Sequence, residues 1–213
     1  MKKDLTEVVF ILDKSGSMCS LTDDTIGGFN SMLKKQKAEK GECLVSTVLF
    51  NSRSRVLHDR LPIEEVGEMT SREYVASGST ALIDALGDAI KHIRTVHRYI
   101  RKEDMPEHTV FIITTDGYEN ASHKYSSNEV RKMVEEQKEA GWEFIFLGAN
   151  IDAVETAREY GIGSDRVANY INDDLGVEKN FSSMSKVISG VRKNGKILAD
   201  WNFEIEEDYK KRK

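Results

Sequence analysis

The segment Asp13-Lys14-Ser15-Gly16-Ser17 carries a carboxylate and two hydroxyls at alternate positions. It directly follows an apolar run at residues 8–12, which predicts a buried strand. Oxygen groups of this kind are the ligands that hard cations such as Mg²⁺ prefer, and Mg²⁺ usually keeps coordination positions open for water or another group. The segment therefore indicates a metal-assisted contact surface before it indicates a catalyst.

Two further segments supply oxygen groups at the ends of predicted elements. Residues 77–80, Ser-Gly-Ser-Thr, precede a predicted helix, and residues 114–117, Thr-Thr-Asp-Gly, follow an apolar run. Alone, a Ser or Thr before a helix is usually an N-cap, and an Asp-Gly pair after a strand is usually a turn. Because ligands of open α/β sheets bind at the carboxyl ends of the strands, the first and third segments are expected to share one rim.

Taken together, the three segments resemble a known pattern. The order Asp-x-Ser-x-Ser, then a distant Thr, then a distant Asp is similar to the metal-ion-dependent adhesion site of von Willebrand factor type A domains, and the resemblance covers residues 5–170. The residues that match are Asp13, Ser15, Ser17, Thr80 and Asp116. The resemblance implies that the two serines bind a metal through their hydroxyls, that the threonine binds directly or through water, and that the two aspartates bind directly or orient coordinated waters.

The resemblance also implies a cofactor and a partner. Mg²⁺ is the expected cation, with Mn²⁺ or Ca²⁺ as alternatives, and oxygen ligands in this number favour Mg²⁺ or Mn²⁺ over Ca²⁺. A protein partner is expected to supply a Glu or Asp side chain to the metal. We expect a non-enzymatic protein-binding module of the intracellular bacterial type.

The elements that must position these residues alternate along the chain. Short runs rich in apolar residues predict strands at residues 7–12, 44–50, 54–61, 109–114 and 142–147. Apolar residues at helical spacing predict helices at residues 22–39, 81–100, 128–140 and 152–160. A short strand at 166–170 and a last helix at 182–191 are expected to follow.

This alternation predicts an α/β fold with a mostly parallel sheet, and the short connection between 44–50 and 54–61 predicts one antiparallel edge strand. The resemblance implies a three-layer, Rossmann-like arrangement with helices on both faces. Residues 1–175 are expected to form this domain. Residues 176–213 are expected to add a helix and then a terminal strand or tail, because Trp201, Phe203 and Ile205 alternate with polar residues.

Composition excludes several functional classes. The 213 residues carry a net charge of −5, which argues against a general nucleic-acid-binding protein. No run approaches the roughly 20 apolar residues of a membrane-spanning helix, and we expect no signal peptide in the first residues. Cys19 and Cys43 are the only cysteines, so no disulfide framework is expected and a cytoplasmic location is the simplest interpretation.

Two alternative functions remain open from the sequence. The first is a magnesium-dependent phosphohydrolase, although aspartyl-phosphate enzymes of the haloacid-dehalogenase type carry a second Asp two residues after the first, where this chain has Ser15. The second is a regulatory or assembly subunit of a larger ATPase-type complex, since intracellular members of the resembled family act in this way. The chain itself has no Walker A sequence.

Overall fold

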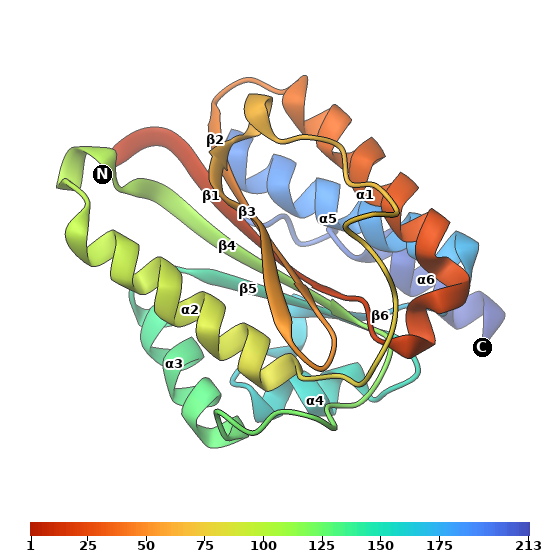
Figure 1. The fold of residues 1–213 in the computed structure, drawn as a ribbon. Helices are drawn as coiled ribbons and strands as arrows, with labels where there is room; N and C mark the ends of the chain where they lie inside the picture. The colour runs from red at the N-terminus through yellow and green to blue at the C-terminus, as the bar shows by residue number, and fades with distance from the viewer.

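A six-stranded sheet forms the centre of the computed structural model, which describes all 213 residues (Figure 1). The strands are β1 (Lys2–Asp13), β2 (Glu42–Phe50), β3 (Ser54–Pro62), β4 (Pro106–Thr115), β5 (Glu143–Gly148) and β6 (Val167–Asn169). Their order across the sheet is β3-β2-β1-β4-β5-β6. All neighbouring pairs are parallel except β2 and β3, which are antiparallel at one edge.

Helices cover both faces of this sheet. They are α1 (Thr22–Lys37), α2 (Leu82–Tyr99), α3 (Ser127–Glu139), α4 (Ala153–Glu159), α5 (Asp174–Asn194) and α6 (Phe203–Arg212). In Figure 1, α1 and α5 lie over one face, and α2, α3 and α4 lie over the other. This arrangement confirms the expected three-layer α/β fold with a mostly parallel sheet and one antiparallel edge strand. No helix combines the length and the apolar character needed to cross a membrane.

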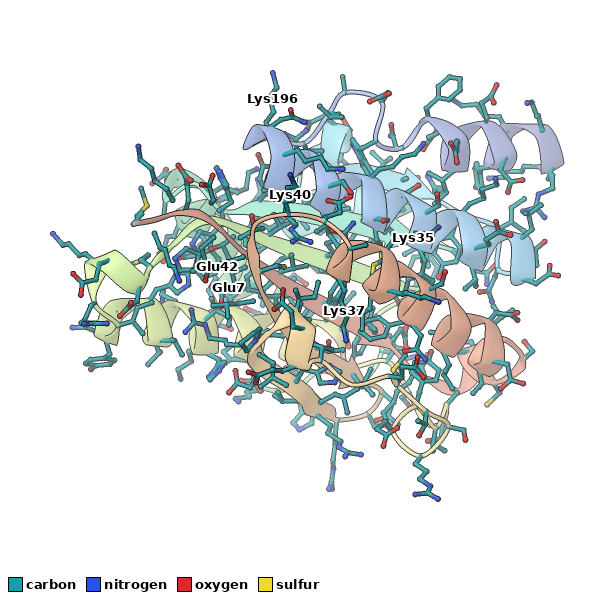
Figure 2. The ribbon with its side chains drawn as sticks, turned by 90° about the horizontal axis from the view of Figure 1, so that it is seen from above. Glu7, Lys35, Lys37, Lys40, Glu42 and Lys196 are labelled. Carbon is teal, nitrogen blue, oxygen red and sulfur yellow. The ribbon has the colours of Figure 1, made fainter.

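A buried carboxylate lies in the amino-terminal half of β1 (Figure 2). Glu7 is 0% exposed, and its two oxygens bind Arg60 Nε and His97 Nε2, each at 2.5 Å. Arg60 comes from β3 and His97 from α2, so this cluster joins the sheet to a helix. Burying a carboxylate is costly unless it is paired in this way.

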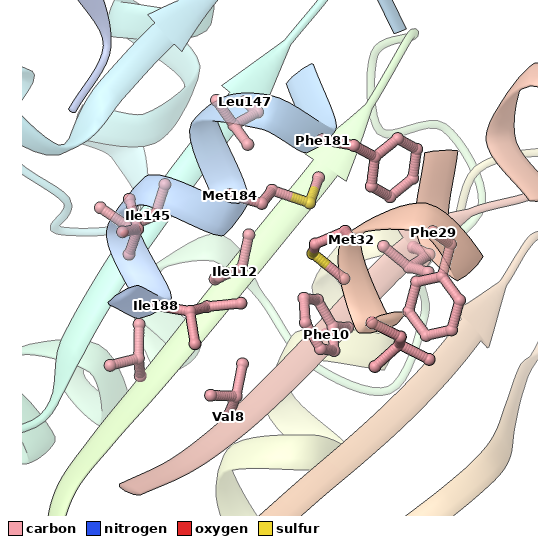
Figure 3. Packing of buried hydrophobic residues seen from close by; sticks show 14 of the residues in the cluster. Val8, Phe10, Phe29, Met32, Ile112, Ile145, Leu147, Phe181, Met184 and Ile188 are labelled. Atoms are coloured by element: carbon pink, nitrogen blue, oxygen red, sulfur yellow. The ribbon is translucent and has the colours of Figure 1, made fainter. Parts of the chain in front are cut away.

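The alternation of side chains along β1 builds two separate cores. Val8, Phe10 and Leu12 pack toward α1 and α5, whereas Val9 and Ile11 pack toward α2 and α3. Figure 3 shows the first of these cores, in which Phe10 meets Phe29 of α1 edge to face, with ring centres 5.5 Å apart. Because helices cover both faces of the sheet, the sequence of β1 is a continuous apolar run and does not alternate between apolar and polar residues.

The C-terminal region differs from its sequence-based prediction. Residues 203–212 form α6, where a strand or extended tail was expected. Trp201 and Ile205 are 2% and 1% exposed, whereas Phe203 is 59% exposed. Trp201 and Ile205 are four residues apart, a spacing that places side chains on the same side of a helix. The two buried residues therefore have helical spacing, and the alternation of apolar and polar residues does not indicate a strand here.

Helix α5 is also longer than expected. It begins at Asp174, eight residues before the predicted start at 182, because Asp173 caps it by accepting a 2.8 Å hydrogen bond from Gly176 N. The expected boundary between residues 175 and 176 therefore lies in the first turn of this helix.

The two edges of the sheet differ in character. Strand β3 is exposed or half-buried along its whole length, and its pairing with β2 is irregular around Thr47. Arg60, within this strand, has a backbone φ of 50°, a value that residues other than glycine rarely adopt. At the opposite edge, β6 has only three residues.

Candidate metal centre

The ends of two adjacent strands bring the first and third predicted segments together. Asp13 is the last residue of β1, and Asp116 directly follows β4. These strands are parallel neighbours in which Leu12 lies opposite Thr114, so both carboxylates emerge at the same edge of the sheet. Thr80 lies two residues before α2. A Cβ placed on Gly117 would lie 3.9 Å from Thr80 Oγ1 and 4.0 Å from Ser17 Oγ, which puts all three segments at one site.

Direct hydrogen bonds connect four of the five predicted residues. Ser17 Oγ donates to Asp116 Oδ1 at 2.6 Å, and the Ser15 and Ser17 hydroxyl oxygens lie 3.1 Å apart. Asp13 Oδ1 accepts from Ser15 N at 2.7 Å, and its Oδ2 accepts from Thr115 Oγ1 at 2.6 Å. The site is therefore a compact set of oxygen atoms.

Two glycines allow the loops that carry these residues to approach one another. Gly16 N donates to Gly78 O at 2.9 Å, and a Cβ at Gly16 would lie only 3.3 Å from that oxygen. Gly78 has a φ of 75°, and a Cβ there would lie 2.7 Å from Ser52 Oγ. A side chain on Gly16 would push the Asp13–Ser17 loop away from the loop that carries Thr80, and one on Gly78 would clash with Ser52 of the β2–β3 turn.

Two asparagines outside the five-residue pattern form hydrogen bonds with residues of the site. Asn120 Oδ1 accepts from Thr80 N at 2.9 Å, and Asn120 N donates to Thr80 O at 3.0 Å. Asn172 Nδ2 donates to Asp116 Oδ2 at 3.1 Å, while its own Oδ1 is buried and has no partner in the protein. The position of Asn172 just after the short strand β6 was the one sequence signal that placed it near this edge.

The electrostatic environment of the two carboxylates is unusual. Asp13 and Asp116 are each 2% exposed, and neither forms an ion pair with a basic side chain. Burial raises the pKa of Asp13 to about 6, although hydrogen bonds from Thr115 and Ser15 act in the opposite direction. Buried negative charge of this kind is compensated by a nearby cation.

The donor set fits a hard divalent cation. The five matching side chains offer only oxygen atoms, from two carboxylates and three hydroxyls, and this chemistry suits Mg²⁺ or Mn²⁺ better than softer metals. The unpartnered Oδ1 of Asn172 adds a polar atom beside the Asp116 carboxylate. Asp13, Ser15, Ser17, Thr80 and Asp116 are thus the residues that would hold such an ion.

Comparison with known proteins adds evidence at the level of the fold. No family model matches the sequence, and no curated protein matches it significantly. Among solved structures, the von Willebrand factor type A protein from Catenulispora acidiphila is 18% identical with a TM-score of 0.59. That match covers 87% of this chain and 42% of the Catenulispora chain, so this chain spans less than half of that protein.

The matches to two further structures cover a larger share of those chains. The vWF domain of the pilus tip protein Mfa5 from Porphyromonas gingivalis is 11% identical with a TM-score of 0.61, over 91% of this chain and 98% of that one. Manganese-loaded TRAP from Plasmodium vivax is 17% identical with a TM-score of 0.55, over 85% and 74%. The chain therefore has the fold of a von Willebrand factor type A domain.

Proposed function

We propose that this chain is a protein-binding module that holds a divalent cation with Asp13, Ser15, Ser17, Thr80 and Asp116. The observation that carries this proposal is the contact between segments: Ser17 Oγ lies 2.6 Å from Asp116 Oδ1 and 3.1 Å from Ser15 Oγ. Mg²⁺ is the proposed cation, and Mn²⁺ is the first alternative because one protein of the same fold is manganese-loaded.

The composition of the site favours a partner that brings negative charge. Three of the five side chains are neutral hydroxyls, and the two carboxylates supply all of the negative charge, so a divalent cation held largely by hydroxyls can attract a further anionic oxygen. Ser17 is exposed, whereas Asp13 and Asp116 are buried, so a partner would approach from the side of Ser17. A Glu or Asp side chain of a partner protein is the proposed anionic group.

Binding is proposed in preference to hydrolysis because of one position. A phosphohydrolase of the aspartyl-phosphate type needs a carboxyl group two residues after the nucleophilic aspartate to act as a general acid. Ser15 occupies that position, and its hydroxyl interacts with Ser17. A phosphatase screen with Mg²⁺ examines this choice, and turnover that disappears in Asp13→Asn would contradict the binding proposal.

Titration with Mn²⁺, followed by electron paramagnetic resonance and calorimetry, tests the metal site. We expect one ion per chain, and we expect Asp13→Ala to weaken binding by more than about 100-fold, since it removes a carboxylate from the site itself. Asp200→Ala is the matched control, because Asp200 is exposed and lies in the segment between α5 and α6. Metal affinity unchanged in Asp13→Ala, or no binding of either Mn²⁺ or Mg²⁺ by the parent chain, would refute the site.

Capture of partners from the native cell tests the second half of the proposal. Proteins retained by the parent chain in Mg²⁺ should be released by EDTA and should not be retained by Asp13→Ala. A partner that is still retained in EDTA and by Asp13→Ala would show that binding occurs through another surface.

A further inference from the structure

Three basic side chains beside the candidate metal centre have no acidic partner. Lys14 directly follows Asp13, and Arg53 and Arg55 lie on the turn and strand of the β2–β3 hairpin. None of the three forms an ion pair, although the chain as a whole carries a net charge of −5. Arg53 and Arg55 are exposed and Lys14 is half-buried, so their charges are available at the surface.

Hydrogen bonds place this hairpin against the loop that carries Thr80. Asn51 Nδ2 donates to Ser77 O at 2.8 Å, and Ser79 N donates to Ser52 Oγ at 2.9 Å. The other side of the same loop contacts Lys14, whose backbone O accepts from Ser77 N at 2.9 Å. The hairpin and Lys14 therefore both border the loop that carries Thr80.

Lys14 and Arg55 lie close enough to influence one another. Arg55 pairs with Leu49 of β2, and Leu49 pairs with Leu12 of β1, two residues before Lys14. Burial lowers the pKa of Lys14, and the positive charge of Arg55 lowers it further.

The positive charge of Arg55 acts on the carboxyl group of Glu73. Hydrogen bonds from Thr70, foremost, and the charge of Arg55 lower the pKa of the Glu73 carboxyl group. Glu73 forms no ion pair, and its Oε2 is engaged by both Thr70 N and Thr70 Oγ1. No carboxylate forms an ion pair with Lys14, Arg53 or Arg55, so the positive charge on the hairpin side of the site is unpaired.

The opposite side of the site carries charges of both signs, because Arg212 and Lys213 line a hollow there together with Tyr118, Asp152 and Asn172. A second hollow of about 330 Å³ lies beyond Tyr118 and is lined by four carboxylates, those of Glu119, Asp152, Glu155 and Glu159. Arg158 pairs with Glu155 there, and Arg212 pairs with Asp173 and Asp208, so the unpaired basic side chains that would attract an acidic partner are concentrated on the hairpin side.

We propose that the partner is an acidic segment in which the Glu or Asp that reaches the metal is accompanied by further carboxylates lying over Lys14, Arg53 and Arg55. This inference rests on the proposed function and gives the partner a composition and a direction.

Fluorescence anisotropy with two labelled peptides tests this inference. One peptide carries a single Glu among neutral residues, and the other carries a Glu flanked on one side by several acidic residues. With Mg²⁺ present, the parent chain should bind the acidic peptide about tenfold more tightly, and this preference should fall as salt is raised. Arg53→Glu combined with Arg55→Glu should abolish the preference.

Arg98→Glu is the control, because Arg98 is exposed, forms no ion pair and lies near the end of α2 away from the site. Mn²⁺ titration of each variant separates loss of the metal from loss of the basic surface. Equal affinity of the parent chain for the two peptides, or no binding of either, would overturn the inference. Binding of the acidic peptide that persists in EDTA and in Asp13→Ala would support the basic surface and contradict the proposed function.

Discussion

Asp116 is held from two directions by residues that lie far from it in the sequence. Ser17 Oγ donates to Oδ1, and Asn172 Nδ2 donates to Oδ2. Both oxygens of one carboxylate are therefore oriented before any ion binds. Groups that orient a metal ligand commonly contribute tenfold to 100-fold to metal affinity.

Replacing Asn172 with leucine should expose this contribution. Asn172→Leu keeps the branched shape of the side chain but removes the donor to Asp116, so Mn²⁺ affinity should fall about tenfold while the fold is retained. Calorimetric titration measures the affinity, and circular dichroism monitors the fold. Asn128→Leu, at an exposed position near the start of α3, should leave the affinity unchanged. A folded Asn172→Leu with the affinity of the parent chain would show that Asn172 does not orient the ligand.

The residues that match the metal-site pattern could be predicted from the sequence, whereas the residues that orient them could not. The spacing of Asp13, Ser15 and Ser17 is local, and the strand pattern was enough to bring Asp116 near them. Asn120 and Asn172 act through contacts that depend on how loops return to the sheet edge, and a single asparagine in a loop has no distinguishing pattern. Their roles became visible only from their hydrogen bonds.

Helices α1 and α5 pack so closely that one glycine has no room for a side chain. A Cβ on Gly28 would lie 2.3 Å from Phe181 Cδ2, whereas a Cβ on Gly27 would meet nothing within 4 Å. These adjacent positions on α1 therefore have opposite requirements. Phe181 also meets Phe29 edge to face, with ring centres 6.4 Å apart, so it cannot shift without disturbing the core.

Alanine at each position gives a matched pair of variants. Gly28→Ala should lower the free energy of unfolding by about 1–3 kcal/mol because it overpacks the contact with Phe181. Gly27→Ala should raise it by about 0.5–1 kcal/mol, because alanine is the better helix former and the space is open. Urea unfolding of both variants measures these values. Equal stabilisation by the two substitutions would show that the helices can separate at no cost.

Helical periodicity predicted the central helices well and the C-terminal ones poorly. The stripe of Leu82, Leu86, Ile90 and Ile93 on α2 is strong, and its structure matches the expected range closely. The first turns of α5 follow the Asp173 cap, and their apolar spacing, with Val177 and Phe181 both buried, was not used in the prediction that began at residue 182. Around the start of α6, Trp201 and Ile205 are buried and Phe203 is exposed, a pattern that both a strand period and a helical spacing can explain, and tertiary packing decided between them.

At the scale of the whole molecule, the candidate metal centre and the buried Glu7 cluster occupy different ends of β1. Glu7 and Asp13 are about 20 Å apart along the strand, at about 3.3 Å per residue. The loops at the carboxyl end carry the oxygen ligands, and the amino-terminal half carries a charge cluster that ties β3 and α2 to the sheet. We expect binding and stability to be separable by mutation.

Glu7→Gln tests this separation. Removing the charge leaves Arg60 and His97 largely buried without their partner, so the free energy of unfolding should fall by about 3 kcal/mol. Mn²⁺ affinity should not change. Glu42→Gln is the control, because its ion pair with Lys2 is exposed and should contribute less than about 1 kcal/mol. A large loss of Mn²⁺ affinity in a folded Glu7→Gln protein would show that the two ends are coupled.

The edges of the sheet also bear on how copies of this protein behave at high concentration. An exposed strand edge is a template on which another chain can add a strand and begin to aggregate. Strand β3 interrupts that template with its irregular pairing, with the left-handed backbone of Arg60 and with Pro62 at its end. The opposite edge offers only the three residues of β6. Growth of the sheet from one molecule into the next is thus blocked on both sides, and concentrated solutions should resist fibril formation.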